Sequence, residues 1–266
     1  MQLLRNIPEV LPQPCVATIG FFDGVHRGHR YLIEQVREVA AAHGFASGVV
    51  TFPVHPRKVV QPEYHPELLT AYEEKVALLA ETGLDYCMML DFTPEVAILS
   101  AKEFMLFLYN HYNIRALVIG YDHRFGHNRS EGFDDYVRYG QELGIEVILA
   151  HAYIDKDVAV SSSVIRQLLS EGNVSEAASC LGYDYFLNGI VVSGYRVGRK
   201  IGFPTANLRV DDPDKLVPSD GVYAVRVTVA GQSYGGMLSI GYRPTMANGT
   251  DPVSYTHLRA HETDSY

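Results

Sequence analysis

The sequence has few cysteines, and they form no recognisable pattern. Cys15, Cys87 and Cys180 are the only three in 266 residues, and no Cys-x-x-Cys pair occurs. This scarcity argues against a disulfide framework and against a structural zinc site, and it favours the reducing cytoplasm as the location. Cys15 and Cys87 lie in apolar runs, so we expect both thiols to be buried.

Long apolar runs and an excess of basic residues are also absent. No run reaches the roughly 18 residues of a membrane span, and the first residues lack the apolar block of a signal peptide. We therefore expect no membrane partner. With 22 Lys and Arg against 31 Asp and Glu, the chain lacks the basic surface that bulk binding of nucleic acid needs. No Gly-x-x-x-x-Gly-Lys-Ser/Thr loop is present, which excludes a P-loop protein. The sequence makes no prediction of oligomeric state.

The chain divides into two parts that differ in charge balance and in the pattern of apolar residues. Residues 1–182 hold 14 Lys and Arg against 23 Asp and Glu, whereas residues 183–266 hold eight of each. In the first part, short apolar runs alternate with helical patterns, which predicts an α/β domain with a parallel sheet. In the second part, strand-like runs are separated by Gly and Pro turns, which predicts a small β unit. The expected strands are Cys15–Gly20, Ala46–Phe52, Tyr86–Leu90, Ala116–Gly120 and Glu146–Ala150, then Phe186–Val192, Gly221–Val229 and Tyr234–Ile240.

The sharpest motif lies between the first strand and the helix expected over His29–His43. His26 and His29 stand three residues apart at a predicted helix N-terminus, where free amides and the helix dipole favour an anion. Gly20, Gly24 and Gly28 would let the backbone approach a phosphate closely. Two imidazole donors there could stabilise charge that develops on the phosphate. A bound metal is an alternative, with His55 or His123 as the third ligand.

Four motifs carry a family resemblance over about residues 12–252. They are GFFDGVHRGH from Gly20, GYDHRFG from Gly120, SSSVIR from Ser161 and GRKIGFPTAN from Gly198. In this order they resemble the motifs of prokaryotic bifunctional riboflavin kinase/FMN adenylyltransferases, also called FAD synthetases. The resemblance implies a Rossmann-like nucleotidyltransferase domain over residues 1–182, followed by a small riboflavin kinase β-barrel over 183–252.

The resemblance also implies residue roles. His26 and His29 would be catalytic and contact the phosphates of ATP. Nucleotide and phosphate would be bound by Gly20, Phe21, Asp23, Gly24, Gly28, Ser162, Ser163 and Arg166, and FMN by Asp122, Arg124 and His55. In the kinase module, Gly198, Lys200, Gly202, Thr205 and Asn207 would bind ATP and Mg²⁺, with Thr205 and Asn207 as the metal ligands. The expected substrates are ATP with FMN or riboflavin, and the expected cofactor is Mg²⁺.

Some positions depart from the family pattern. Pro53 and Val54 replace an Asp-Pro pair in the loop after the second strand, and Ser163 replaces a threonine. The resemblance ends near Pro252, before the kinase's catalytic glutamate and C-terminal helix. We interpret residues 253–266 as a foreign, disordered tail on a truncated, incomplete barrel. We therefore expect riboflavin kinase activity to be absent or very weak.

Two other functions stay open at this point. One is a different nucleotidyltransferase of the same His-x-Gly-His type, acting on a pantetheine or pyridine nucleotide. The other is a noncatalytic protein that binds flavin or nucleotide. The Pro-Thr-Ala-Asn segment disfavours the first, and the intact His26, His29 and Arg166 disfavour the second.

Overall fold

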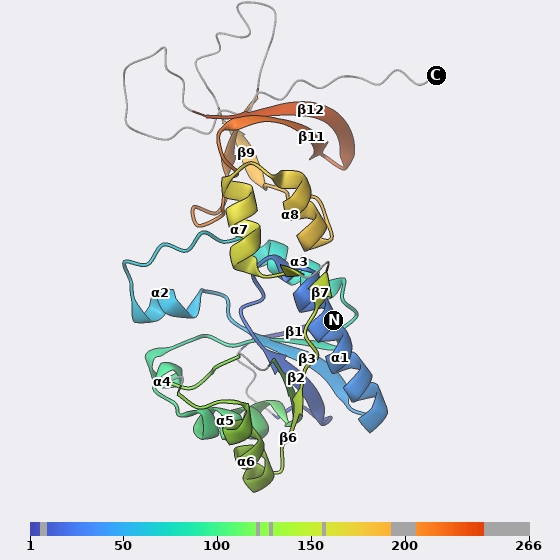
Figure 1. Ribbon diagram of the computed structural model, residues 1–266, viewed down its shortest axis with the longest axis vertical. Helices are drawn as coiled ribbons and strands as arrows, with labels where there is room; N and C mark the ends of the chain where they lie inside the picture. The colour runs from blue at the N-terminus through green and yellow to red at the C-terminus, as the bar shows by residue number, and fades with distance from the viewer. Residues whose placement is uncertain (6–9, 121–122, 128–129, 156–157, 193–205, 242–266) are drawn as a thin grey trace, which may run out of the picture. The chain divides into compact units, whose positions relative to one another are not determined.

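The computed structural model describes residues 1–5, 10–120, 123–127, 130–155, 158–192 and 206–241. Contacts divide the chain into two compact units, one of residues 1–162 with 180–182 and one of residues 163–179 with 183–266 (Figure 1). The second unit thus includes most of α7 (Ser162–Ser170) and α8 (Val174–Leu181). The domain boundary at residue 182 stays a prediction. Outside the described residues lie Asp122, Gly198, Lys200, Gly202, Thr205 and the segment 253–266.

The first unit is built on one parallel six-stranded sheet. Its order is β1-β4-β3-β2-β5-β6, and every neighbouring pair is parallel. The prediction of an α/β domain with a parallel sheet is confirmed, and five of the strands are those expected. The sixth, β1, was not predicted. In spatial order the strands are Gln2–Arg5, Tyr86–Met89, Ala46–Thr51, Cys15–Ile19, Ile114–Ile119 and Glu146–Leu149.

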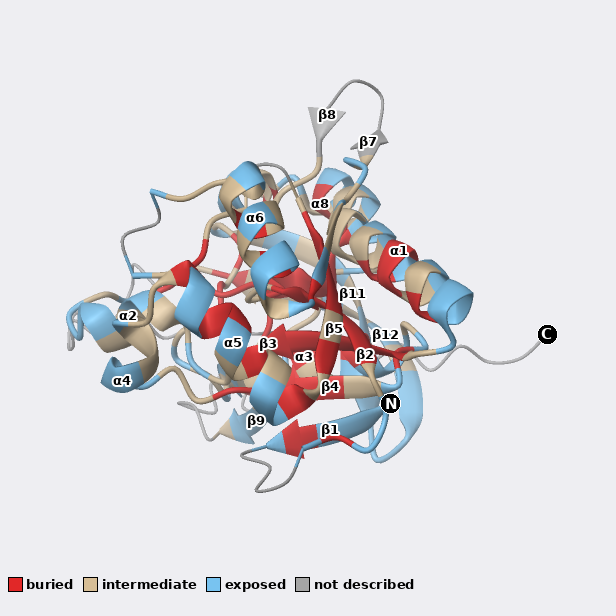
Figure 2. Cartoon of the chain, turned by 90° about the horizontal axis from the view of Figure 1, so that it is seen from below, coloured by how far each residue is buried: buried red, intermediate tan, exposed pale blue. Residues whose placement is uncertain are grey.

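Helices cover both faces of this sheet. α1 (Arg27–His43) packs on β2 and β3, while α5 (Ala101–Tyr112) and α6 (Phe133–Leu143) lie on the opposite face (Figures 1 and 2). β2 and β3 are buried along their whole length (Figure 2). The thiols of Cys15 and Cys87 are buried as expected, and burial raises the pKa of Cys15 to about 12 and that of Cys87 to about 11. The shorter helices of the first unit are η1 (Asp23–Val25), α2 (Pro56–Val60), α3 (Tyr72–Ala80) and α4 (Pro94–Ala97).

The strand order reverses beside β2. The chain moves from β2 through β3 to β4 on one side, then returns to β5 on the other side of β2. In open α/β sheets, ligands bind at such a point, beyond the carboxyl ends of the strands. The segments that follow β2, β3 and β5 therefore occupy the expected ligand-binding edge.

The second unit contains two antiparallel pairs among its described residues. β9 (Gly189–Val192) pairs with β10 (Asn207–Val210), and β11 (Gly221–Val229) pairs with β12 (Gln232–Ile240). The predicted β character is confirmed, whereas a barrel is only partly indicated by these strands. A further short pair, β7 (Ile154–Asp155) with β8 (Val158–Ala159), belongs to the first unit.

Candidate active site

The loop between β2 and α1 has a strained backbone. Phe22 and Val25 have φ angles of 55° and 37°, in the left-handed region that non-glycine residues rarely adopt. Gly24, between them, has a φ of 80°, and a Cβ there would lie 2.8 Å from Leu69 Cδ1. Such strain persists only where surrounding contacts impose it, and it is frequent at functional sites.

Asp23 supplies those contacts. Its carboxylate is buried and accepts hydrogen bonds from the Leu69 amide at 2.9 Å, the Thr70 amide at 3.1 Å and the Thr70 hydroxyl at 3.3 Å. Thr70 Oγ1 in turn accepts the Gly24 amide at 3.1 Å. The Asp23 carboxylate therefore connects the loop between β2 and α1 (the His loop, residues 20–26) to the segment that precedes α3. The expected role of Asp23 in nucleotide binding stays a prediction.

This use of Thr70 overturns one local expectation. In the sequence, Thr70 with Glu73 three residues later predicts a capping box that opens a helix through about Thr82. Instead α3 begins at Tyr72, and Glu74 accepts the Ala71 amide at 2.9 Å. The prediction was wrong because Asp23, distant in sequence, engages the Thr70 hydroxyl.

His26 and His29 lie together at the start of α1. Their rings stack with centroids 3.6 Å apart and an interplanar angle of 17°. His26 is the N-cap, and its Nδ1 accepts the His29 amide at 3.3 Å. When neutral, His26 therefore carries its proton on Nε2, where it can donate. One of the helix amides expected to face a phosphate is already bonded to His26.

His29 is held neutral by its surroundings. Burial lowers its pKa well below 6.5, and the neighbouring His26 and Lys75 lower it further. Its Nδ1 is buried and has no hydrogen-bond partner among the described residues. A buried ring nitrogen in that state can receive or donate a hydrogen bond when a ligand arrives.

Two neighbouring positions pack closely around the pair. A Cβ on Gly28 would lie 3.2 Å from both His26 Nδ1 and the Val160 carbonyl oxygen, so only glycine fits without a shift. Ser162 Oγ donates to the Asp23 carbonyl at 3.0 Å. The serine motif thus begins in contact with the His loop. Ser163 and Arg166 lie on α7 in the second unit.

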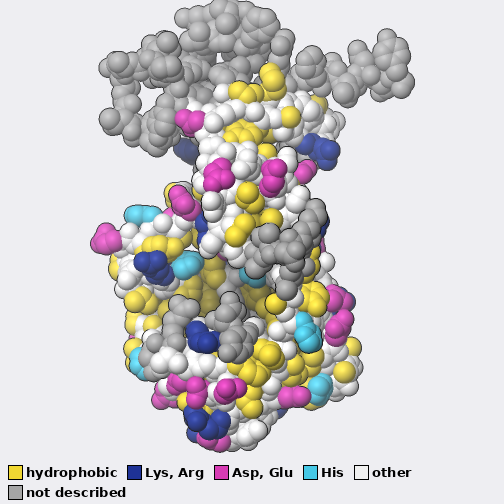
Figure 3. Space-filling model, viewed as in Figure 1, with side chains coloured by type: hydrophobic (Ala, Val, Ile, Leu, Met, Phe, Trp, Pro, Cys, Tyr) yellow, Lys and Arg dark blue, Asp and Glu magenta, His cyan; other side chains and the backbone are white. Residues whose placement is uncertain are grey.

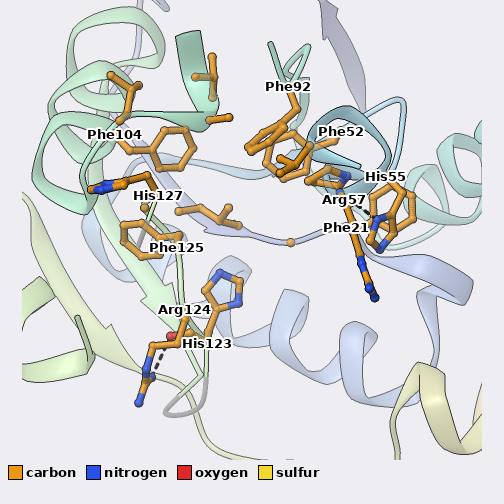
Figure 4. Close-up of a pocket in the computed structure, with 18 of the residues that line it drawn as sticks. Phe21, Phe52, His55, Arg57, Phe92, Phe104, His123, Arg124, Phe125 and His127 are labelled. Atoms are coloured by element: carbon orange, nitrogen blue, oxygen red, sulfur yellow. Dashed lines mark hydrogen bonds between the residues drawn. The ribbon is translucent and has the colours of Figure 1, made fainter. Parts of the chain in front are cut away.

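A cavity of about 680 Å³ opens at the carboxyl edge of the sheet. It extends from Gly20 and Phe21 after β2 to residues 123–127 after β5. Figure 4 shows Phe21, Phe52, Phe92 and His55 along one side, and Phe104, Phe125 and His127 along the other. His55 and Arg124, two of the three residues expected to bind FMN, both line it. His26 and His29 do not line the cavity.

The residues that hold the cavity walls were not identified from the sequence. Tyr136 on α6 is fully buried and stacks on Phe125 at 4.1 Å. Its hydroxyl accepts the Phe125 amide at 3.1 Å and donates to the Glu131 carbonyl at 3.1 Å. Lys75 on α3 is also buried and donates to the carbonyls of Phe21 and Phe52. Neither residue belongs to a motif, so only the tertiary fold identifies them.

The described part of the second unit contains Asn207, one of the two residues expected to bind Mg²⁺. Asn207 begins β10, is 7% exposed, and its Oδ1 has no hydrogen-bond partner among the described residues. An unpaired amide oxygen is a donor type that suits Mg²⁺. In the described part of the chain, no three His, Cys, Asp or Glu side chains are grouped to hold a metal, so no third ligand joins His26 and His29.

A parallel sheet with a histidine pair on its first helix and a cavity over its carboxyl edge defines an α/β domain of the nucleotide-binding class. Comparison with known proteins specifies it further. The FAD synthetase family model matches residues 9–164, and the riboflavin kinase family model matches residues 181–266. The second match runs through residues 253–266, whose foreign origin stays a prediction.

Relatives cover most of the chain. The bifunctional riboflavin kinase/FMN adenylyltransferase of Escherichia coli K12 is 36% identical over 93% of this chain and 80% of its own length. That of Listeria monocytogenes is 36% identical over 86% of this chain and 73% of its own length. The crystal structure of a macrolide-efflux protein from Streptococcus pneumoniae is 29% identical, with a TM-score of 0.80, and covers 99% of this chain and 92% of that one. The chain belongs to the bifunctional riboflavin kinase/FMN adenylyltransferase family.

Among the described residues, no helix has the length and apolar character to cross a membrane. On the face shown in Figure 3, acidic and basic side chains of the described residues are interspersed, with no broad basic area.

Proposed function

We propose that the first unit transfers AMP from ATP to FMN, giving FAD and pyrophosphate. One observation supports the proposal most strongly: a stacked histidine pair, the buried N-cap His26 and the half-buried His29, stands at the start of α1, in a domain whose sheet has an aromatic cavity at its carboxyl edge. Family membership supports the same reaction, and it favours neither a noncatalytic binding protein nor a different nucleotidyltransferase.

The reaction is an in-line displacement. A phosphate oxygen of FMN forms a bond to the α-phosphorus of ATP, the bond from that phosphorus to the bridging oxygen breaks, and pyrophosphate leaves. Positioning and charge stabilisation supply most of the catalysis in such a transfer. We assign to His26 Nε2 and to the ring of His29 the stabilisation of negative charge on the phosphates. A neutral His29 still donates a hydrogen bond to a phosphate oxygen, although it brings no charge.

The cavity supports a flavin as the acceptor. Its aromatic lining offers stacking and edge contacts to a planar ring system, and Arg124 and His55 lie on its wall as polar groups. We place the isoalloxazine ring in this cavity, with the FMN phosphate directed toward the start of α1. Asp122, the third expected residue, lies outside the described part of the chain.

Mg²⁺ is the cofactor that we propose for both nucleotide sites, because it neutralises phosphate charge when bound. In the second unit, Asn207 Oδ1 and the Thr205 hydroxyl would hold it with the ATP of a riboflavin kinase reaction. The buried, unpaired oxygen of Asn207 fits that role. The expectation from the sequence that riboflavin kinase activity is absent or very weak stays a prediction, which formation of FMN from riboflavin and ATP at a rate comparable to FAD formation would contradict.

The proposal for the first unit is tested by incubating the purified chain with FMN, ATP and Mg²⁺ and separating the flavins by chromatography. FAD should accumulate with enzyme and time. Replacing FMN by a pantetheine or pyridine nucleotide acceptor, with ATP and Mg²⁺ kept, should give no turnover, whereas turnover only with those acceptors would support a different nucleotidyltransferase. FMN binding without release of pyrophosphate would support the noncatalytic alternative.

A further inference from the structure

Lys75 has an unusual place for a lysine. It lies on α3 (Tyr72–Ala80) with 2% of its surface exposed. Burying an ammonium group is costly unless hydrogen bonds or charges compensate it. Here burial lowers the pKa of Lys75 to about 8, while Asp23 and Cys87 act in the opposite direction. A leucine or methionine would fill such a space at lower cost, so the amino group must contribute something that an apolar side chain does not.

The contacts of the amino group show what that is. Nζ donates to the Phe52 carbonyl at 2.7 Å and to the Phe21 carbonyl at 3.2 Å. It also lies 3.9 Å from the centroid of the Phe21 ring, within the range of a cation–π contact. Phe21 and Phe52 follow the carboxyl ends of the neighbouring strands β2 and β3. One side chain therefore joins two adjacent strand ends and a ring.

Both phenylalanines form the same wall of the cavity (Figure 4). Phe21 packs edge-on against His55 at 4.8 Å, and Phe52 packs edge-on against Phe92 at 5.4 Å. Thr51 Oγ1 donates to the Phe21 carbonyl as well, at 3.2 Å. The position of each ring depends on its backbone, and Lys75 contacts the backbone of both.

We propose that Lys75 is a positioning residue for flavin binding, which holds Phe21 and Phe52 where their rings shape one wall of the cavity. This inference rests on the proposed function, because it assigns the cavity to the flavin. Lys75 itself does not line the cavity. Its effect should therefore fall on the affinity for FMN rather than on ATP, whose phosphates we place at His26 and His29.

The test compares Lys75→Met, Lys75→Arg and a control, Lys102→Met. Lys102 is exposed on α5 and pairs with Glu142. The dissociation constant of FMN is measured by quenching of flavin fluorescence, and KM for ATP and kcat are measured with saturating FMN. We expect Lys75→Met to weaken FMN binding about tenfold or more, since two hydrogen bonds and a cation–π contact are lost. KM for ATP should change less than about threefold, Lys75→Arg should recover most of the affinity, and Lys102→Met should match the wild type.

A pH profile adds a readout that a purely structural role would not change. Titratable groups near Lys75 are Asp23 on η1, His29 on α1 and Cys87 on β4. When Lys75 loses its charge near pH 8, its amine can still donate to both carbonyls, but the cation–π contact with Phe21 is lost, so the FMN affinity of the wild type should fall as the pH rises through 8. Lys75→Arg should lack that step, because arginine stays protonated. This comparison also decides the matter if Lys75→Met does not fold.

Several results would overturn the proposal. One is a folded Lys75→Met protein with a lower melting temperature and unchanged FMN affinity, and another is the same pH profile in wild type and Lys75→Arg. Wild-type protein that binds FMN but forms no FAD would contradict the adenylyl transfer alone, because the affinity comparison remains valid. Wild-type protein that binds no FMN would overturn both.

Discussion

Replacing Asp23 by Asn distinguishes an architectural role from the ligand role that the resemblance implies. The carboxylate accepts two backbone amides and one hydroxyl in a buried place. A hydrogen bond to an ionised group contributes about 1.5–3 kcal/mol, and one between neutral groups about 1 kcal/mol. Asparagine weakens the bonds that remain and turns an NH₂ group toward an N–H donor. We therefore expect the free energy of unfolding to fall by about 2–4 kcal/mol.

The measurement is urea unfolding followed by circular dichroism, with the midpoint and slope compared between variants. Asp134→Asn is the matched control, because Asp134 is exposed in the first turn of α6 and its loss should cost about 0.5 kcal/mol. The reasoning would be refuted if Asp23→Asn kept the stability of the wild type and raised KM for ATP instead. That result would make Asp23 a nucleotide ligand and not an anchor for the loop.

Three further predictions concern the site. His29→Ala should lower kcat for FAD formation by about 10²-fold or more, which is the scale for one lost oxyanion donor. The control His65→Ala, at an exposed position, should have no effect. Equal rates for both variants would contradict the role of His29 in stabilising charge on the phosphates. Because the folded pKa of His29 is lowered, the folded protein binds fewer protons than the unfolded chain below pH 6.5, so stability should fall as the pH drops through that range. His29→Gln should show a shallower loss in urea melts at pH 5 and 7, and an unchanged slope would count against a buried neutral ring. Tyr136→Phe removes the hydroxyl that accepts the Phe125 amide, so KM for FMN should rise about fivefold with kcat little changed; an unchanged KM would separate Phe125 from the flavin.

The strands of the first sheet were predictable because each is a short apolar run closed by polar or glycine residues. β1 was not, since only Leu4 of its four residues is buried and its pairing with β4 joins segments more than 80 residues apart. Local signals succeeded where the partners are local. Ser100 with Glu103 three residues later predicts a capping box at the start of α5, and this box forms, with the Ser100 amide donating to Glu103 Oε2 at 2.8 Å.

In the site, too, features set by local sequence were predictable, and features set by distant contacts were not. Its histidine pair and glycines stand in one short motif, so their place at a helix start followed from sequence. Lys75 and Tyr136 could not be identified in this way, because their importance comes from contacts with strand ends and loops that only the fold brings near. The stacking of His26 on His29, which uses His26 Nδ1 as a helix cap, also depends on rotamers that the sequence does not state.

The central claim is the transfer of AMP from ATP to FMN, and it is tested most directly with a label on the α-phosphorus, which moves with the AMP. With ATP labelled at the α-phosphorus, FMN and Mg²⁺, the account predicts that label enters FAD and that one pyrophosphate is released for each FAD formed. Label that stays in ATP or appears in ADP, with no labelled flavin, would contradict it.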